Sequence, residues 1–183
     1  LKGDREDMAK GIGAPYGPAG SIMSTVNDML KWVQFNLNNG RVGDKQLISE
    51  AAMKEMHKAN MLMSEPLLMP CKEMDFFSYG MGWFVETYRG HVMVEHGGNI
   101  NGFSALVTMI PDQKLGVVTL TNFNDSFDTY ATTYEIIDRV LGAKGGDWNN
   151  RWREFVGQVF AALPEQMKAM NPARIEGTKP THD

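Results

Sequence analysis

Three consecutive residues, His96, Gly97 and Gly98, form the segment of this 183-residue chain whose types and spacing best suit chemistry. Paired glycines at the end of a strand let a ligand approach the backbone closely. The backbone N–H groups that follow, beginning at Asn99, can then act as hydrogen-bond donors. His96 can donate a hydrogen bond or carry positive charge beside a carboxylate or an oxyanion. The glycines can also serve a β-bulge, with His96 an ordinary surface side chain, and these residues alone favour that plainer interpretation.

Other reactive motifs are absent from the sequence. Neither Ser-x-x-Lys nor Gly-x-Ser-x-Gly occurs, so no serine nucleophile can be recognised. Residues 97–102 do not follow Gly-x-Gly-x-x-Gly, and a strand rather than a helix comes next, which excludes a dinucleotide-binding loop. His91 and Glu95 share one face of a strand without a third ligand, so we expect a solvated pair, no metal and no cofactor. Cys71 is the only cysteine, which rules out a disulfide within the chain.

Composition and charge narrow the class of protein. The formal net charge is −4 and no run of Lys and Arg offers a surface to nucleic acid, so we expect no nucleic-acid partner. Hydrophobic residues make up 43% of the chain, which is enough for a packed core in one domain of ordinary size. No apolar stretch is long enough to span a bilayer, and the charged N-terminal residues lack a signal-peptide core.

Hydrophobic periodicity predicts the elements that must position these residues. Dense Gly and Pro make residues 1–20 irregular. Thr25 is expected to cap a helix over residues 26–37, and Ser49 is expected to cap a shorter second helix. Residues 60–78 have no clear period and are expected to form a long surface loop. Alternating residues then predict strands joined by short turns, hence an antiparallel meander, at residues 79–86, 91–95, 103–110 and 115–122.

Two further helices are expected after the strands. Asp128 is expected to cap the first, which carries an apolar stripe and ends at Gly142. The second carries Trp152 and is expected to end or bend at Pro164. Together the elements indicate an α+β fold, an antiparallel β-sheet flanked by helices. We divide the chain into an irregular segment (1–20), a main unit (21–142), and a connector helix with a linker tail (143–183).

Four motifs, taken in order, resemble those of class C β-lactamase-like serine hydrolases, a group related to penicillin-binding proteins. Residues 17–29 resemble the family's Pro-Ala-Gly entry to a helix. Residues 79–83, Tyr-Gly-Met-Gly-Trp, are similar to its Tyr-Gly-Leu-Gly-Trp strand. Residues 96–104 look like its His-Gly-Gly segment with the following Gly-Phe-Ser, and residues 111–122 match its closing hairpin and final strand. The order and the family-like spacing make the set far more specific than any single motif.

The resemblance implies a β-lactamase/transpeptidase-like fold and hydrolysis of an amide, lactam or ester through an acyl-enzyme. In that family a Ser-x-x-Lys serine attacks the carbonyl, a Tyr-x-Asn motif assists proton transfer, and a Lys-Thr-Gly or His-x-Gly motif lines the site. His96 and Asn99 would then be catalytic, and Gly97 and Gly98 would bind substrate. The backbone N–H of Asn99 would form one half of the oxyanion hole. Histidine in place of lysine favours an esterase, peptidase or amidase over an efficient β-lactamase.

The nucleophile and the Tyr-x-Asn motif normally precede these segments, and neither is present, so the chain corresponds to the C-terminal half of the domain. We expect the parent protein to use a small-molecule or peptide acyl substrate, with the missing N-terminal half as this chain's partner. We expect little turnover by the chain alone, and self-association through a bare sheet edge. The resemblance also points to an extracytoplasmic or membrane-associated parent. The alternative is a non-catalytic binding or scaffold module of the same fold.

Overall fold

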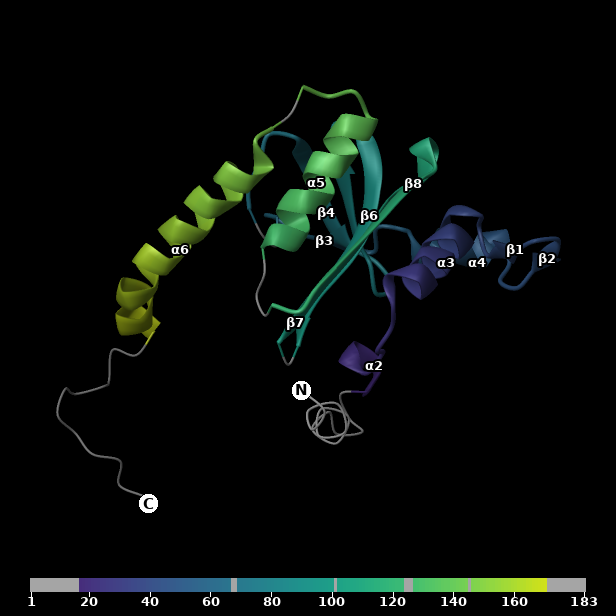
Figure 1. The fold of residues 1–183 in the computed structure, drawn as a ribbon, viewed down its shortest axis with the longest axis horizontal. Coiled ribbons are helices and arrows are strands. Elements are labelled where there is room, and N and C mark those ends of the chain that lie inside the picture. The colour runs from purple at the N-terminus through teal and green to yellow at the C-terminus, as the bar shows by residue number, and fades with distance from the viewer. Residues whose placement is uncertain (1–16, 67–68, 101, 124–126, 145, 171–183) are drawn as a thin grey trace, which may run out of the picture.

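An antiparallel six-stranded sheet forms the centre of the molecule, in a computed structural model that describes residues 17–66, 69–100, 102–123, 127–144 and 146–170 (Figure 1). Its strands follow chain order: β3 (Met61–Leu62), β4 (Met74–Tyr79), β5 (Phe84–Tyr88), β6 (His91–Ile100), β7 (Phe103–Ile110) and β8 (Leu115–Thr121). A separate two-stranded hairpin consists of β1 (Arg41–Val42) and β2 (Lys45–Gln46). The expected α+β fold with a meander is therefore confirmed.

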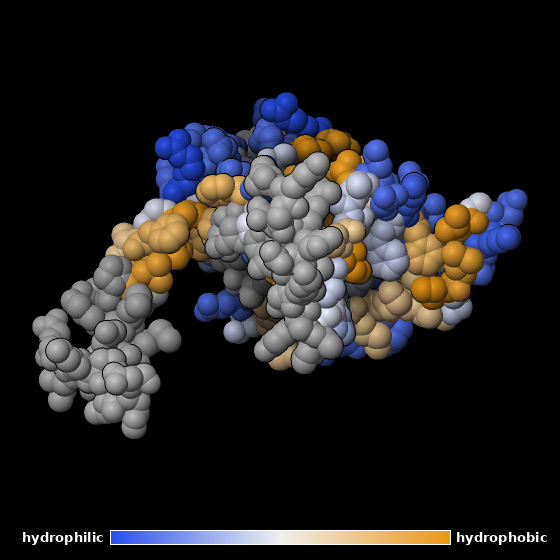
Figure 2. All heavy atoms as spheres, turned by 60° about the horizontal axis from the view of Figure 1, so that its bottom comes forward, coloured by the Kyte–Doolittle hydropathy of each residue, from blue (hydrophilic) through white to orange (hydrophobic). Residues whose placement is uncertain are grey.

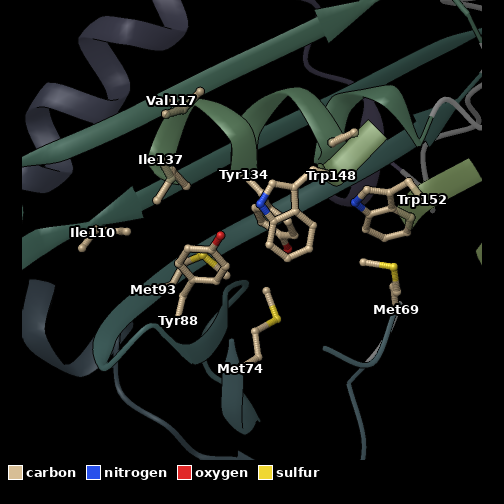
Figure 3. Close-up of a cluster of buried hydrophobic side chains, with 11 residues drawn as sticks. Met69, Met74, Tyr88, Met93, Ile110, Val117, Tyr134, Ile137, Trp148 and Trp152 are labelled. Carbon is tan, nitrogen blue, oxygen red and sulfur yellow. The ribbon is translucent and has the colours of Figure 1, made fainter. Parts of the chain in front are cut away.

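The sheet has a core on each face, because successive side chains of a strand point to opposite sides. Helix α3 (Val26–Leu37) covers one face, where Val33 packs with Val85, Val94 and Met109. Helix α5 (Asp128–Val140) covers the other face, and helix α6 (Trp148–Met170) packs on α5 and adds Trp148 and Trp152 from its first turns to the same core. The second core is larger and rich in aromatic and methionine side chains (Figure 3): Met69, Met74, Tyr88, Met93, Ile110, Val117, Tyr134, Ile137, Trp148 and Trp152.

Helices α3 and α4 begin where their caps predict. The Thr25 hydroxyl accepts a hydrogen bond from the backbone N–H of Asp28 at 3.3 Å, and the Asp28 carboxylate accepts the Thr25 hydroxyl proton at 3.0 Å. Helix α4 (Glu50–Met56) begins after Ser49, whose hydroxyl accepts from the backbone N–H of Ala52 at 3.2 Å. Both caps satisfy backbone donors that have no partner inside the first helical turn.

Three expected segments differ in the structure. Of residues 1–20, only the part that the structure describes can be compared, and there α2 (Gly17–Gly20) forms a short helical turn. The expected loop at 60–78 contains β3 and all of β4 except its last residue. The pairing of β4 with β5 is irregular between Met74 and Phe77, and this irregularity hides the alternation of apolar and polar residues in the sequence. The expected strand at 79–86 is interrupted by a turn, in which the N–H of Gly80 donates to the carbonyl of Trp83 at 2.8 Å.

The last two helices also differ from expectation. Asp128 lies inside the first turn of α5, and Phe127 precedes that helix without a side-chain cap, so the expected cap is wrong. Helix α6 begins at Trp148, which is fully buried, and it continues past Pro164 to Met170. Its later turns carry exposed apolar side chains, Val159, Phe160 and Leu163 (Figure 2). No helix in the described ranges is long and apolar enough to cross a membrane.

Candidate active site

Strand β6 carries residues 96–98 within its length, not at its end. Its pairing with β7 runs one to one through His96↔Val107, Gly97↔Leu106 and Gly98↔Ala105. A bulge would place two residues of one strand opposite one of the other. The bulge interpretation of the two glycines is therefore wrong, and the segment is regular strand.

The backbone of β6 extends past the end of β5. The two strands form a hairpin around Arg89-Gly90, with Tyr88↔His91 beside the turn and Phe84↔Glu95 as the last pair. Pairs beside a two-residue turn exchange hydrogen bonds, and such pairs alternate along an antiparallel ladder. Glu95 therefore bonds to β5. By the same alternation, Gly97 and Asn99 direct their N–H groups to that side, beyond the last pair with β5.

The two glycines differ in what surrounds them. A Cβ atom at Gly97 would collide with the hydroxyl of Tyr130 on α5. A Cβ atom at Gly98 would have no described heavy atom within 4 Å. Gly97 is thus needed for close packing of α5 on the sheet, while Gly98, on the opposite side of the strand, faces space that is open as far as the described residues go.

His96 is exposed, and both of its ring nitrogens have contacts. Nδ1 lies 2.7 Å from the carbonyl oxygen of Gly97, and Nε2 lies 3.2 Å from the hydroxyl of Tyr79. The ring of Phe84 lies beside it, with centroids 5.5 Å apart. A carbonyl can only accept, so Nδ1 carries a proton, and a neutral ring then accepts at Nε2.

The side chain of Asn99 is held against β7. Its Oδ1 lies 2.5 Å from the hydroxyl of Ser104, which also lies 2.8 Å from the carbonyl of Phe123. These contacts fix the side chain of Asn99 and leave its backbone N–H as the group on the β5 side of the strand. The oxyanion role expected of Asn99 requires only that backbone N–H.

Two carboxyl groups lie beneath this strand, on the face covered by α5. Glu95 is buried and accepts hydrogen bonds from the hydroxyls of Thr108 (2.8 Å) and Tyr134 (3.0 Å). Burial raises the pKa of Glu95 to about 7. Burial, together with the nearby Glu95, raises the pKa of Glu86 to about 8. Both line a cavity of about 20 Å³, also bordered by Tyr130 and Trp152, which is room for about one water molecule.

The expected solvated pair of His91 and Glu95 is wrong. The side chain of Glu95 is buried under α5, whereas His91 is the first residue of the strand, with Nδ1 2.6 Å from a carboxylate oxygen of Asp112. Within the described residues, no group of three or more His, Cys, Asp or Glu side chains is placed to hold a metal ion.

Comparison with known proteins identifies the family. A model of the Beta-lactamase family matches residues 2–141, which is most of the chain. This chain belongs to the β-lactamase family. The β-lactamase-like unit thus includes the sheet and α5, and the match ends just before α6.

Three relatives show how much of a β-lactamase-family protein this chain represents. Unguisins hydrolase ungD of Aspergillus violaceofuscus is 32% identical, and the match covers 88% of this chain and 30% of that relative. Unguisins hydrolase ungD' of Aspergillus campestris is 25% identical, with 84% and 28% covered. Protein flp of Staphylococcus aureus is 28% identical, with 60% and 19% covered. The chain therefore spans less than a third of the curated relatives that it matches.

A solved structure supports the same fold. The octameric penicillin-binding protein homologue from Pyrococcus abyssi superposes with a TM-score of 0.55 at 20% identity, over 66% of this chain and 25% of that one. At this identity the likeness concerns the fold alone. The partial β-lactamase/penicillin-binding-protein-like fold expected from the sequence is confirmed.

The structure brings the four expected site residues together on β6, and it adds neighbours that the sequence did not single out. Tyr79 contacts His96, and its one signal was that it opens the Tyr-Gly-Met-Gly-Trp motif. Tyr130, which closes in on Gly97, had only an apolar helical stripe to mark it. Their importance depends on pairing and packing that are not local in sequence.

Proposed function

We propose that this chain forms one wall of the acyl-enzyme site of a β-lactamase-like serine hydrolase that acts on an amide, lactam or ester. The observation that carries the proposal is the edge of β6, where the backbone N–H groups of Gly97 and Asn99 face past the end of β5 beside His96. The Asn99 N–H acts as one oxyanion donor, and the nucleophile's own N–H acts as the other. Removing one such donor typically costs about 3 kcal/mol of transition-state stabilisation.

The open space at Gly98 supports this role, because a substrate must lie directly along the strand for its oxyanion to reach backbone donors. Gly98 and Gly97 then serve as substrate-binding residues by their backbone alone. The two Aspergillus relatives are named as hydrolases of unguisins, which supports hydrolysis as the reaction class. With histidine at the position where the family can carry lysine, we propose an ester or amide as substrate in preference to a lactam antibiotic.

The nucleophile comes from outside this chain, in our proposal from an N-terminal half that carries Ser-x-x-Lys and Tyr-x-Asn. Exposed apolar side chains support docking of such a half: Ile22 is 87% and Phe123 69% exposed. Strand β8 is an edge of the described sheet, and its backbone can pair with a further strand. Without the partner half, the same edge favours self-association of the chain.

Acylation measured by intact-protein mass spectrometry tests the proposal. The probes are an activated ester and a penicillin. We expect no adduct on the 183-residue chain, and a one-to-one adduct on the protein read from the coding sequence upstream of Leu1 in frame with this chain. A stoichiometric adduct on the chain alone, or the absence of Ser-x-x-Lys upstream, would refute the proposed division of the site.

A variant tests the role of β6 in that longer protein. Gly98→Val adds bulk into the open space beside the strand and should slow acylation at least tenfold while leaving the fold intact. The matched control is Asp44→Ala, an exposed residue of the β1–β2 turn, which should acylate at the normal rate. Normal acylation by Gly98→Val would show that substrate does not lie along this strand.

A further inference from the structure

We infer that Tyr79 is a positioning residue for His96, whose ring it holds at the edge of β6 in a single tautomer. The inference rests on the proposed function of β6. It gives a role to Tyr79, which the sequence marked only as the first residue of a motif. Tyr79 acts through the histidine, whose exposed ring contacts the backbone of Gly97 on β6.

The protons of the three groups can be arranged in only one way for a neutral ring. The Gly97 carbonyl lies 2.7 Å from Nδ1 and can only accept, so Nδ1 is the nitrogen that carries the hydrogen. Nε2 of that tautomer has a lone pair and no hydrogen. The Tyr79 hydroxyl, 3.2 Å away, must therefore donate to Nε2. Removing this hydroxyl removes the contact that favours an unprotonated Nε2.

Tyr79 is well anchored for this purpose. It is the last residue of β4, and it pairs with Phe84, which in turn pairs with Glu95 next to His96. The three rings form one cluster, with centroid distances of 4.8 Å for Tyr79–Phe84 and 5.5 Å for Phe84–His96. Aromatic contacts at this range are attractive and restrict rotation of each ring.

The backbone around Tyr79 adds to this rigidity. The Tyr79 carbonyl accepts from the N–H of Asn60 at 3.2 Å, and the next residue, Gly80, lies so close to the Lys58 carbonyl that a Cβ atom would collide with it or force it to move. Because this backbone is held in place, the Tyr79 hydroxyl is pre-organised, and little conformational entropy is lost when it donates to His96.

Positioning has a chemical consequence at the proposed site. The Nδ1–H group is directed to the Gly97 carbonyl, and Nε2 is turned to Tyr79, so the neutral ring adds no N–H donor to compete with the backbone donors. The oxyanion then meets the proposed backbone donors, the N–H of Asn99 and that of the nucleophile, without an N–H donor from the His96 ring. In the absence of Tyr79, the ring can change tautomer and rotate, and an Nε2–H donor enters the site.

Nitrogen NMR of the chain labelled with ¹⁵N-histidine tests the inference, because long-range ¹H–¹⁵N correlations distinguish the two tautomers of a neutral ring. We expect His96 of the unaltered chain to be the Nδ1–H tautomer, opposite to the Nε2–H form that free histidine prefers in water. In Tyr79→Phe, which removes one hydroxyl, we expect the His96 signals to move towards the Nε2–H pattern. The signals of His57 and His91 should stay in place and so report an intact fold.

Two outcomes would overturn the inference. One is an Nε2–H tautomer for His96 in the unaltered chain, a result that requires no variant to fold. The other is an unchanged His96 tautomer in a folded Tyr79→Phe chain. Tyr130→Phe is the matched control: it also removes one tyrosine hydroxyl next to β6, but on the α5 side, and it should leave His96 unchanged.

Activity separates this inference from the proposed function. In the longer protein, Tyr79→Phe should slow acylation roughly two- to tenfold, the usual range for one neutral hydrogen bond. If the longer protein is not acylated at all while the tautomer changes as expected, the proposed function fails and the positioning of His96 stands. If the longer protein is acylated and the His96 tautomer does not change in Tyr79→Phe, the proposed function stands and the positioning of His96 by Tyr79 fails.

Discussion

Gly97→Ala and Gly98→Ala should change the stability of this chain in opposite directions, although the residues are neighbours on one strand. Alanine relieves the entropic cost of a glycine inside a strand, which is about 0.5–1 kcal/mol, at either position. At Gly98 the added methyl group meets open space, so that gain should remain. At Gly97 the methyl group meets the Tyr130 hydroxyl, and overpacking of this kind costs about 1–3 kcal/mol.

The two variants should therefore differ by about 1–3 kcal/mol in the free energy of unfolding. For a domain of this size, that corresponds to roughly 2–12 °C in melting temperature. Thermal unfolding followed by circular dichroism measures it directly. Because the clash is with the hydroxyl, while the ring carbon Cζ is at an ordinary 3.4 Å, Tyr130→Phe should restore most of the stability lost in Gly97→Ala.

A double-mutant cycle across Gly97→Ala and Tyr130→Phe isolates this contact. We expect a coupling energy of about 1 kcal/mol or more. The reasoning is refuted if Gly97→Ala is as stable as Gly98→Ala, or if Gly97→Ala costs the same with tyrosine and with phenylalanine at position 130.

Three further predictions concern stability. Burial raises the pKa of Glu95 from 4.5 to about 7, so the folded chain holds a proton that the unfolded chain releases, and the free energy of unfolding should fall as pH rises from about 4.5 to 7. Glu95→Gln should flatten this decline in urea titrations, and an unchanged slope would contradict the assignment. Asp138 accepts from Tyr88 (2.6 Å), Arg89 (2.6 Å) and Trp148 (2.9 Å), so Asp138→Asn should cost about 3 kcal/mol in urea, and a loss below about 1 would contradict the network. Thr25→Ala should cost about 1 kcal/mol and speed amide exchange in the first turn of α3, and unchanged exchange there would count against the cap.

The helices α3 and α4 could be predicted because their signals are local. Thr25 and Ser49 each bond to a backbone N–H three residues later, and such a pattern is visible in the sequence. Strand β3 could not be predicted in this way. It has two residues, and what makes it a strand is its pairing with Ser78 and Tyr79, which lie about 17 residues further along the chain.

For the candidate site too, the residues could be predicted from the sequence but their long-range contacts could not. The types of residues 96–99 and their place among the other motifs led to β6, and the structure puts all four on one regular strand. What they touch was not predictable, since Tyr79 reaches His96 across β5, and Tyr130 reaches Gly97 from α5. The burial of Glu95 likewise follows from Tyr134 and Thr108, which pack over it after the sheet has formed.

Because β6 pairs regularly with its neighbours, the number of residues in the strand decides which side chains face each core. Between the Arg89-Gly90 turn and Gly98, odd-numbered residues such as Met93 and Glu95 enter the α5 core, and even-numbered ones such as Val94 enter the α3 core. Inserting or deleting one residue there would exchange the two sets. The buried carboxyl group would meet the valines under α3, and the histidine would turn into the aromatic core. Variant libraries of this strand should therefore accept substitutions at exposed positions such as Val92 but no change of a single residue in length.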